Sequence, residues 1–394
     1  MDGKIKVFIM DLLCITPFYD RYLFECLQKR IYEVTLGAIS FHEDIGYFKR
    51  HGIRTNPGMM DIVSKLQIKN KIFRQILKAI EYMVNLFFIS LRFWIRPPDI
   101  IYIHWVPLIR KLPFDAWFLR IMQTRGIKLV YMVHNVLPHD TGMKHKKAYR
   151  KIYHMVDFLT CHTEQVKKDL VEQFKISPEK VDVVPHGPMF HDTIKINYTE
   201  ARKKLSYNDQ VVILFFGLIR HYKGIEFLLQ SWKKVVNVCP NAVLMLVGHG
   251  DDFYLNQLKI IIDELKIGCH VLNEFRYVSN EELVIFHQAA DILVYPYKEI
   301  SQSGALLTGM TFGKPIVATK VGGIKEILVN NETAVLVDYG DVNGFSEALV
   351  DLIKDPHKRS ELGGKALDLV HSKYSWDVVA RKTINSFYKL INKG

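Results

Sequence analysis

Two basic side chains in one glycine-bounded loop are the first candidates for chemistry in this sequence. Arg220 and Lys223 lie within residues 215–224, which follow an apolar run and lead into a helix-length stretch. Gly217 and Gly224 allow the backbone to turn tightly there. Fixed cations beside a helix N-terminus can bind a diphosphate and stabilise the charge on a departing phosphate. Two solvated loop cations explain the same residues, so this loop alone assigns no function.

A longer pattern of the same kind runs from Tyr295 to Glu326. A predicted strand delivers a polar loop to a predicted helix whose first turn carries small residues, and a pair of glycines closes the segment. The backbone N–H groups of Ser303 and Gly304 would face an anion at that helix start, and the helix dipole would add attraction. Gly248 also follows a predicted strand, although a plain turn explains it equally well.

Two histidines follow predicted strands in the first half of the chain. His104 and His134 each come directly after an apolar run. A histidine at a strand end is ordinarily structural, yet ligands of parallel sheets bind beyond the carboxyl ends of the strands, so either histidine could reach one. The loop at residues 11–19 is apolar and aromatic and contains no glycine, which indicates either a hydrophobic ligand or simple packing.

These residues are all positioned by short apolar runs of strand length. The runs are residues 4–10, 100–103, 129–133, 158–161 and 181–184, followed by 211–216, 242–247, 270–272, 292–295, 315–318 and 334–337. Near-continuous apolar strands separated by helix-length segments predict parallel sheets that are covered on both faces. The pattern pauses after residue 185, so we expect two doubly wound α/β domains, joined near residues 186–205, with a cleft between them.

The composition is that of a globular protein with an uneven charge. Of 394 residues, 49% are apolar and 24% charged, and the five cysteines are scattered, which indicates neither a disulfide framework nor a paired metal site. Residues 51–150 hold 17 Lys/Arg against 5 Asp/Glu, a difference of 12 that equals the net charge of +12. A basic region attracts phospholipid head groups, lipid-linked diphosphates or nucleic acid, and charge alone does not choose between them. The short apolar run near the N-terminus does not resemble a secretory signal, so we expect a cytoplasmic protein.

Residues 62–96 predict one long helix that stops where Arg96 precedes two prolines. Its most apolar stretch, residues 83–95, is shorter than the roughly 20 residues that a membrane span needs. Two interpretations stay open. The helix packs on the first domain, or it lies in a membrane interface with Lys/Arg on one side and Phe/Trp on the other.

The second half of the chain resembles family 4 of the retaining glycosyltransferases. That family has the motifs GxxxxxKG, VGxG, aDvxvxP, an acidic loop, GxPVVAT and GGxxEx, and here they occur in the same order between residues 217 and 327. The resemblance implies a GT-B fold of two Rossmann-like domains, with an acceptor-binding domain at residues 1–190 and a nucleotide-sugar-binding domain at 191–374. It further implies a C-terminal helix, residues 375–394, that crosses back to the first domain.

The resemblance also assigns roles in the donor site. By matching position it implies that Arg220 and Lys223 clamp the diphosphate, while Gly217 and Gly248 form turns of the donor site. Leu218 departs from the arginine that the family usually has directly after the first glycine, and Arg220 is a plausible substitute. The motif match further places Glu326 beside the donor, either as a contact or only to orient its loop. In the first domain it implies that His134 lies beside the transferred sugar, where it positions groups and stabilises charge, while the leaving phosphate takes the acceptor proton.

The paired glutamates of the family are out of register in this chain. Counting back from the GxP glycine places Thr308 and Ile300 at their positions. Glu299, next to Ile300, serves the sugar if the loop shifts by one residue, and Thr308 offers a hydroxyl without a charge. The SQSG sequence of this loop resembles one branch of the family, in which Ser303 and Gly304 would carry the phosphate contact.

We therefore expect a retaining, metal-independent glycosyltransferase without a further cofactor. Its donor would be a nucleotide sugar, a UDP-sugar rather than a GDP-sugar, and its acceptor a lipid-linked or surface-polysaccharide saccharide. Residues 51–150 would contact the inner face of an anionic membrane, and no nucleic-acid partner is expected because no such motif is present. Two alternatives remain: a nucleotide-sugar epimerase of the same fold, which the motif spacing disfavours, and a non-catalytic nucleotide-sugar sensor or scaffold.

Overall fold

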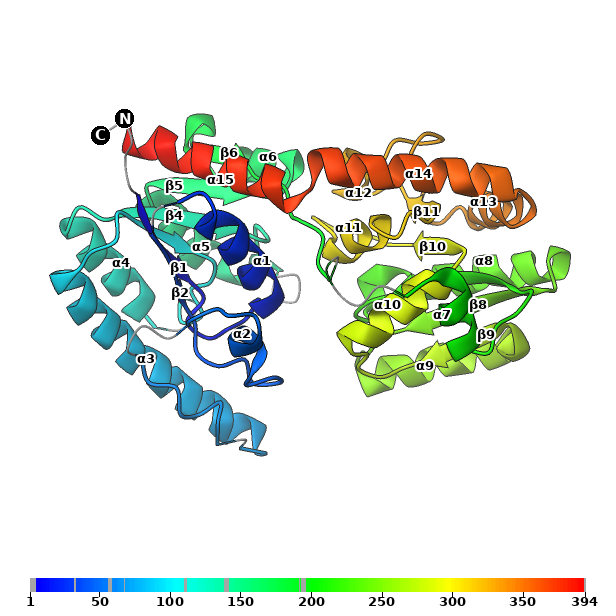
Figure 1. Cartoon of the computed structure of the whole chain (residues 1–394), viewed down its shortest axis with the longest axis horizontal. Helices are drawn as coiled ribbons and strands as arrows, with labels where there is room; N and C mark the ends of the chain where they lie inside the picture. The colour runs from blue at the N-terminus through cyan, green and yellow to red at the C-terminus, as the bar shows by residue number, and fades with distance from the viewer. Residues whose placement is uncertain are drawn as a thin grey trace. The chain divides into compact units, whose positions relative to one another are not determined.

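The computed structural model describes residues 5–31, 33–55, 59–66, 68–109, 112–137, 142–190, 192 and 196–392. The described chain forms two compact units. The first comprises the residues up to Pro185 together with those from Trp376 onward, and the second runs from His186 to Ser375. Each unit contains one parallel six-stranded sheet with helices on both faces, which is the doubly wound arrangement predicted for each half (Figure 1).

The sheet of the first unit has the strand order β2-β1-β3-β4-β5-β6. Its strands are β1 (Lys6–Met10), β2 (Glu33–Gly37), β3 (Ile100–Ile103), β4 (Lys128–Val133), β5 (Phe158–Cys161) and β6 (Val181–Val183). Five of them match the predicted apolar runs, and β2 was not predicted. This edge strand is exposed or half-buried over its first three residues and buried only at Leu36 and Gly37, so it leaves no continuous apolar run in the sequence.

The described part of the first unit has seven α-helices around this sheet. They are α1 (Pro17–Gln28), α2 (Tyr47–Arg50), α3 (Lys71–Ile95), α4 (Phe114–Thr124), α5 (Lys146–Met155), α6 (Glu164–Phe174) and α15 (Trp376–Ile391). The last of these, α15, follows the whole second unit in sequence but belongs to the first. Trp376 stacks on Tyr22 of α1 with ring centroids 5.5 Å apart, and Ser386 donates a hydrogen bond to Asp182 at 2.8 Å.

Helix α3 begins later than predicted. The prediction of one helix over residues 62–96 was wrong at its start, because the helix begins at Lys71, where Asn70 accepts a hydrogen bond from the N–H of Phe73 at 3.1 Å. Its end at Ile95, before Arg96 and the two prolines, is as expected. Among the helices that the structure describes, none combines the length and the apolar character that a membrane span requires.

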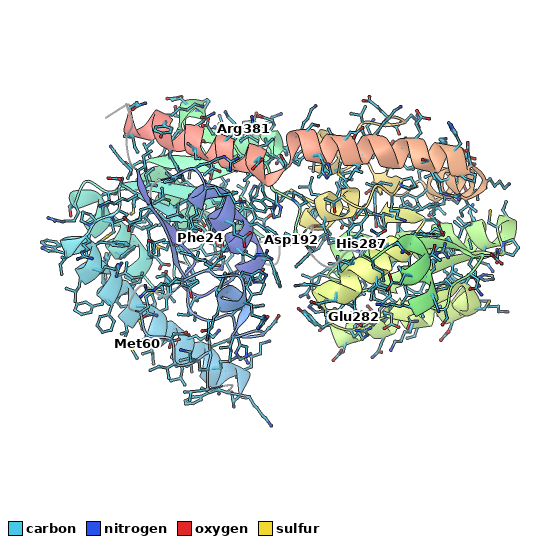
Figure 2. All side chains as sticks on the ribbon, viewed as in Figure 1. Phe24, Met60, Asp192, Glu282, His287 and Arg381 are labelled. Carbon is cyan, nitrogen blue, oxygen red and sulfur yellow. The ribbon has the colours of Figure 1, made fainter. Side chains whose placement is uncertain are left out.

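Buried polar side chains of α3 explain why the preceding residues are not helical. Glu81 accepts hydrogen bonds from the N–H groups of Ile62 (2.6 Å) and Val63 (3.1 Å). Asn85 accepts from the N–H of Met60 and donates to its carbonyl, at 2.6 and 2.9 Å. Met60 is labelled beside α3 in Figure 2. Backbone N–H groups that donate to side chains of α3 cannot also donate to the hydrogen bonds within a helix of their own.

The sheet of the second unit has the order β12-β11-β10-β7-β8-β9. Its strands are β7 (Val211–Phe216), β8 (Ala242–Val247), β9 (Val271–Glu274), β10 (Ile292–Tyr295), β11 (Ile316–Thr319) and β12 (Val335–Val337). Each matches a predicted run to within two residues. The α-helices are α7 (Tyr198–Lys204), α8 (Ile225–Val238), α9 (Asp252–Glu264), α10 (Asn280–Ala289), α11 (Gly304–Met310), α12 (Ile324–Ile327), α13 (Val342–Lys354) and α14 (Pro356–Lys373).

Candidate functional site

Loops that follow strands of the second sheet are packed backbone against backbone. Gly248 after β8 has a φ of +145°, and an added Cβ would lie 1.9 Å from the carbonyl oxygen of Gly217 after β7. A Cβ on Gly224, whose φ is +66°, would lie 2.0 Å from the carbonyl oxygen of Pro296 after β10. Only glycine fits these positions, so the two glycines bring the loops of three strands together at one edge of the sheet.

The loop between β10 and α11 is fixed by the next strand and by the glycine pair. Thr319 of β11 donates a hydrogen bond to the carbonyl of Tyr297 at 2.5 Å, and the N–H of Gly323 donates to Ile300 at 3.0 Å. A Cβ on Gly322 would lie 1.7 Å from the carbonyl oxygen of Ile300. The glycine pair therefore lies flush against this loop and fixes its backbone.

Lys223 is a buried cation without a carboxylate. Its ammonium lies 3.7 Å from the ring centroid of Tyr297 and 5.1 Å from that of Tyr222, and within the described residues no Asp or Glu pairs with it. Burial lowers the pKa of Lys223 to about 8. A buried ammonium that lies against aromatic rings and has no acidic partner among the described residues stabilises the protein poorly by itself and is suited to receive an anion. Arg220, three residues earlier, is exposed.

Ser303 and Gly304 lie at the start of α11, as predicted from the small residues there. The Ser303 hydroxyl accepts a hydrogen bond from the N–H of Leu306 at 3.2 Å, so this side chain caps the helix. The groups of this turn that suit an anion are therefore backbone N–H groups. His186, which the sequence did not single out, lies against this turn, since a Cβ on Gly304 would be 3.2 Å from its Cε1.

The imidazole of His186 is neutral. It is buried, its Nδ1–H donates to the carbonyl of Gly187 at 2.6 Å, and burial lowers its pKa to about 4. With the proton on Nδ1, the Nε2 atom is an acceptor. The ring can therefore accept a hydrogen bond beside Gly304 but adds no charge there.

Of three further predicted residues, one is buried and hydrogen-bonded and two are exposed. Thr308 is buried within α11, and its hydroxyl oxygen accepts the N–H of Met189 at 3.0 Å. Glu299 is exposed in the β10–α11 loop. Glu326 is exposed on α12, where its charge adds to burial in raising the pKa of Tyr374.

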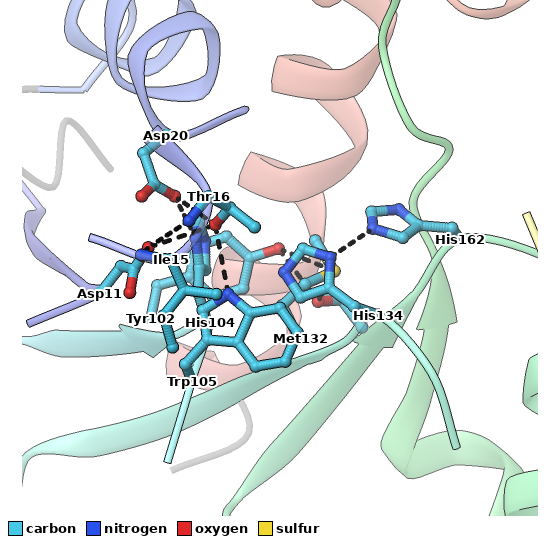
Figure 3. Close-up of polar contacts among 11 residues, drawn as sticks. Asp11, Ile15, Thr16, Asp20, Tyr102, His104, Trp105, Met132, His134 and His162 are labelled. Carbon is cyan, nitrogen blue, oxygen red and sulfur yellow. Dashed lines mark hydrogen bonds and ion pairs between the residues drawn. The ribbon is translucent and has the colours of Figure 1, made fainter. Parts of the chain in front are cut away.

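In the first unit, four polar residues each come directly after one of four neighbouring strands. Asp11 follows β1, His104 follows β3, His134 follows β4 and His162 follows β5 (Figure 3). Because these strands are adjacent and parallel, their first following residues gather at one edge of the sheet. His104 and His134 were candidates from the sequence, whereas Asp11 and His162 were given no role, although the same signal marks all four. Within the described ranges, no three His, Cys, Asp or Glu side chains are grouped to hold a metal ion.

His104 belongs to a buried carboxyl cluster. Its Nδ1 lies 2.6 Å from a carboxyl oxygen of Asp20, and both side chains are fully buried. Burial lowers the pKa of His104 to about 4 and raises that of Asp20 to about 7. Burial and the Asp20 carboxylate also raise the pKa of Asp11. Asp11 accepts the N–H groups of Ile15 and Thr16 at 2.6 and 2.8 Å, so the cluster shapes the loop after β1.

His134 is held by stacking and by a second histidine. Its ring is parallel to that of Trp105, with centroids 5.0 Å apart, and the indole N–H donates to Thr16 at 3.2 Å. His162 donates its Nδ1–H to the carbonyl of Val184 at 3.0 Å, so its Nε2 is an acceptor. That Nε2 lies 3.3 Å from Nδ1 of His134. The chain of bonds therefore places the proton of a neutral His134 on Nδ1 and leaves its Nε2 as an acceptor.

Tyr19 fills the space between the three histidines. Its ring centroid lies 5.6, 5.5 and 5.7 Å from those of His104, His134 and His162, and 5.3 Å from that of Trp376. Tyr19 is buried. Tyr19, which lies in the first turn of α1, therefore serves packing.

Family models and curated relatives match most of this chain. Residues 21–187 match the model of "Glycosyltransferase Family 4", and residues 210–355 match "Glycosyl transferases group 1". An uncharacterized glycosyltransferase of Methanocaldococcus jannaschii is 26% identical over 254 residues, which are 63% of this chain and 64% of that protein. A D-inositol 3-phosphate glycosyltransferase of Corynebacterium aurimucosum is 25% identical over 282 residues, 69% of this chain and 67% of its own. The matches thus span about two thirds of these relatives.

The fold also matches solved structures over nearly the whole chain. Anabaena HepE, solved in complex with UDP-glucose, superposes with a TM-score of 0.76 at 15% identity, covering 98% of this chain and 100% of its own. At that identity the likeness is one of fold. The structure has two parallel six-stranded sheets, and glycines join the loops of the second half in the order of the family motifs. The two family models together extend from residue 21 to residue 355. The chain therefore belongs to family 4 of the glycosyltransferases and has the GT-B fold.

Proposed function

We propose that this protein is a retaining glycosyltransferase that moves a sugar from a nucleotide sugar to a saccharide acceptor without a metal ion. The second unit would bind the donor, and the first unit would bind the acceptor and the transferred sugar. Family membership supports transfer, and the UDP-glucose complex of HepE supports a UDP-sugar. The observation that carries the proposal is the buried ammonium of Lys223, which has no carboxylate partner within the described residues.

Lys223 would meet the diphosphate of the donor. The protein has already removed most of the water around this ammonium, so a bound diphosphate gains a strong electrostatic partner. When the bond between sugar and phosphate breaks, negative charge grows on the diphosphate, and the attraction to Lys223 grows with it. Arg220 would add a second, exposed cation. Two fixed cations can supply the charge that a metal ion supplies in other transferases, which motivates the metal-independent proposal.

Backbone groups would complete the phosphate contact. The first N–H groups of α11, at Ser303 and Gly304, would donate to phosphate oxygens, and Gly217 and Gly248 would allow the donor to approach the neighbouring loops. Glu299 and Glu326, both exposed, would contact sugar or ribose hydroxyls. Thr308 we assign to holding Met189 instead of the ribose, since its oxygen already accepts that N–H.

His134 would bind a hydroxyl of the transferred sugar. Its Nε2 is an acceptor in the neutral ring, and a hydroxyl is a donor, so the two are complementary. His134 would then position the sugar and stabilise charge, and the leaving phosphate would take the proton of the acceptor. The acceptor would be a lipid-linked or surface-polysaccharide saccharide.

A thermal-shift panel of UDP-, GDP-, ADP- and TDP-sugars tests the donor assignment. A ligand at 100 times its dissociation constant stabilises the protein by about 2.7 kcal/mol, which is readily measured as a rise in the melting temperature. Failure of every nucleotide sugar to bind would sink the proposal. NMR of the product, made with and without EDTA, then shows whether the anomeric configuration is retained and whether a metal is required. Binding without turnover on any lipid-linked or free saccharide would favour the sensor alternative.

A further inference from the structure

Helix α3 buries polar residues on one side and exposes apolar residues on the opposite side. Glu81 and Asn85 are buried and bonded to the segment 60–63, and Tyr82 donates a hydrogen bond to Asp115 of α4 at 2.6 Å. These bonds fix the rotation of the helix about its axis. The side opposite them faces away from the sheet (Figure 1).

That outward side is apolar along the whole helix. Large side chains spaced three, four or seven residues apart, each 48–61% exposed, lie on one stripe of the helix, here called the apolar strip: Phe73, Ile76, Ile80, Phe87, Leu91 and Trp94. With a rise of about 1.5 Å per residue, the stripe is roughly 30 Å long. Exposed apolar patches of this extent mark interaction surfaces in proteins.

Helix α4 extends the apolar surface beside α3. Trp117 and Ile121 are one turn apart on α4 and are 57% and 45% exposed. Arg125, just after α4, lies over the ring of Trp94 at 4.3 Å and so joins the two helices at the surface. The outward side of α4 therefore continues the apolar strip.

A basic groove follows on the other flank of α4. Arg120 lies three residues after Trp117 and therefore about 60° further round the helix, on the flank away from Arg125. It lines a groove of about 580 Å³ between α4 and α5, together with Lys147, Arg150, Lys151, Gln123, His154 and Met155. Of the described residues that line this groove, four are permanent cations and none carries a carboxylate. Within the described residues, none of the four is in an ion pair with an acidic side chain.

We propose that the apolar strip and the basic groove together dock the protein on an anionic phospholipid bilayer. The apolar side chains would enter the boundary between head groups and acyl chains, with α3 lying parallel to the membrane. The groove would take lipid phosphates, whose negative charge matches its four cations. The combination selects a bilayer, since a nucleic acid offers phosphates but no apolar phase for Phe87, Leu91 and Trp94. This inference concerns the first unit alone and does not depend on the donor site.

Co-sedimentation of the full chain with vesicles tests this assignment. Vesicles of phosphatidylglycerol and phosphatidylethanolamine should bind the protein and shift its tryptophan emission to shorter wavelength, because Trp94 and Trp117 enter an apolar phase. Vesicles of phosphatidylcholine alone should bind much less. A charge variant, Arg150→Gln with Lys151→Gln, should bind the anionic vesicles about 30-fold more weakly, since each cation near the surface contributes about fivefold.

An apolar variant separates the two parts of the surface. Phe87→Ser with Leu91→Ser should weaken binding at least tenfold and reduce the emission shift, because less apolar area leaves water. The matched control is Phe253→Ser on α9 of the second unit, which is 71% exposed and far from the strip in sequence. It should bind vesicles as the unchanged protein does. Circular dichroism and melting temperature establish that each variant is folded.

The outcomes are decisive in both directions. Binding to anionic vesicles that both double variants lose and the control keeps supports the proposal. No binding to anionic vesicles, equal binding to phosphatidylcholine, or no loss in a folded double variant overturns it. Binding to duplex DNA in place of vesicles, with the apolar variant unaffected, also overturns it and assigns the groove to nucleic acid.

Discussion

The two units build their candidate sites from different parts of the chain. In the second unit the site consists of backbone: Gly217, Gly224 and Gly248 let loops touch, and one buried lysine, Lys223, supplies the charge. In the first unit it consists of side chains that bind one another, with four polar residues at four strand ends. The backbone site leaves a spaced glycine pattern in the sequence. The side-chain site leaves only single polar residues after apolar runs.

Because the two candidate sites are built differently, we expect substitutions to impair them in different ways. Replacement of Lys223 removes the buried one of the two cations that we propose to meet a donor. In the first unit the tautomer of His134 is set by its hydrogen bond to His162, whose own tautomer is set by the carbonyl of Val184. A substitution of His162 therefore changes which nitrogen of His134 carries the proton.

The largest effect is expected from Lys223→Met. With the nucleotide sugar that the thermal-shift panel selects, kcat/KM should fall about 1,000-fold, because a preorganised charge at the leaving diphosphate is lost. Steady-state kinetics measure this. Lys204→Met, at an exposed position at the end of α7, is the control and should change kcat/KM less than twofold. If the two variants lose activity equally, Lys223 has no special role.

A large loss of stability is expected from Gly248→Ala. The new Cβ would meet the carbonyl of Gly217 at 1.9 Å, at a φ of +145° that alanine rarely adopts. We expect the free energy of unfolding to fall by roughly 3 kcal/mol, measured by urea denaturation. Gly364→Ala is matched to it, because a Cβ there meets nothing within 4 Å and the position is inside α14. That change should raise stability by up to about 1 kcal/mol. A destabilisation of similar size in both variants would argue against the packed loops.

His162→Phe should reduce turnover while the donor still binds. Without an acceptor at Nδ1 of His134, the proton of that ring is no longer confined to one nitrogen, and kcat should fall about 10- to 100-fold, as for other residues that orient an imidazole. His162→Gln keeps an acceptor near the former Nε2 and should recover part of kcat. Calorimetry should show the same nucleotide affinity in both. Equal losses in Phe and Gln variants would reduce His162 to a packing role.

A smaller effect is expected from pH. Burial lowers the pKa of Lys223 from 10.5 to about 8, so the folded protein releases this proton at lower pH than the unfolded chain does. The unfolded chain therefore binds more protons between pH 8 and 10.5, and the contribution of Lys223 to stability rises with pH across that window. Nucleotide affinity should change in the opposite sense, falling about tenfold from pH 7 to pH 9 as the ammonium is lost. Lys223→Met should abolish this pH dependence, and a wild-type affinity that is flat over the same range contradicts it.

Most of the fold could be predicted because buried parallel strands are continuous apolar runs. The strand β2 could not, since Glu33, Val34 and Thr35 are at least partly exposed at the sheet edge. The predicted start of α3 was also wrong, because Glu81 and Asn85 look like surface residues in the sequence but hydrogen-bond to the backbone of the preceding segment. In both cases the deciding contacts join residues that are distant in sequence or lie at an edge.

The candidate site could be predicted where the backbone defines it. The glycine turns and the start of α11 could be predicted from the spacing of residues in the sequence. Sequence spacing could not separate buried Lys223 from exposed Arg220, because both follow the same strand. Nor could it show that Thr308 is bonded to Met189, 119 residues earlier in the chain. His162 carried the same signal as His134 and was overlooked because only its hydrogen bonds reveal its role.

We propose that buried Lys223 meets the diphosphate of the donor. Isothermal titration calorimetry at pH 7 tests it most directly, with the nucleoside diphosphate of the selected sugar titrated into the unchanged protein and into Lys223→Met. We predict that the variant, shown to be folded by circular dichroism, binds the diphosphate at least 100-fold more weakly, while the corresponding nucleoside without phosphates binds both proteins alike. An unchanged affinity for the diphosphate in the variant would contradict the account.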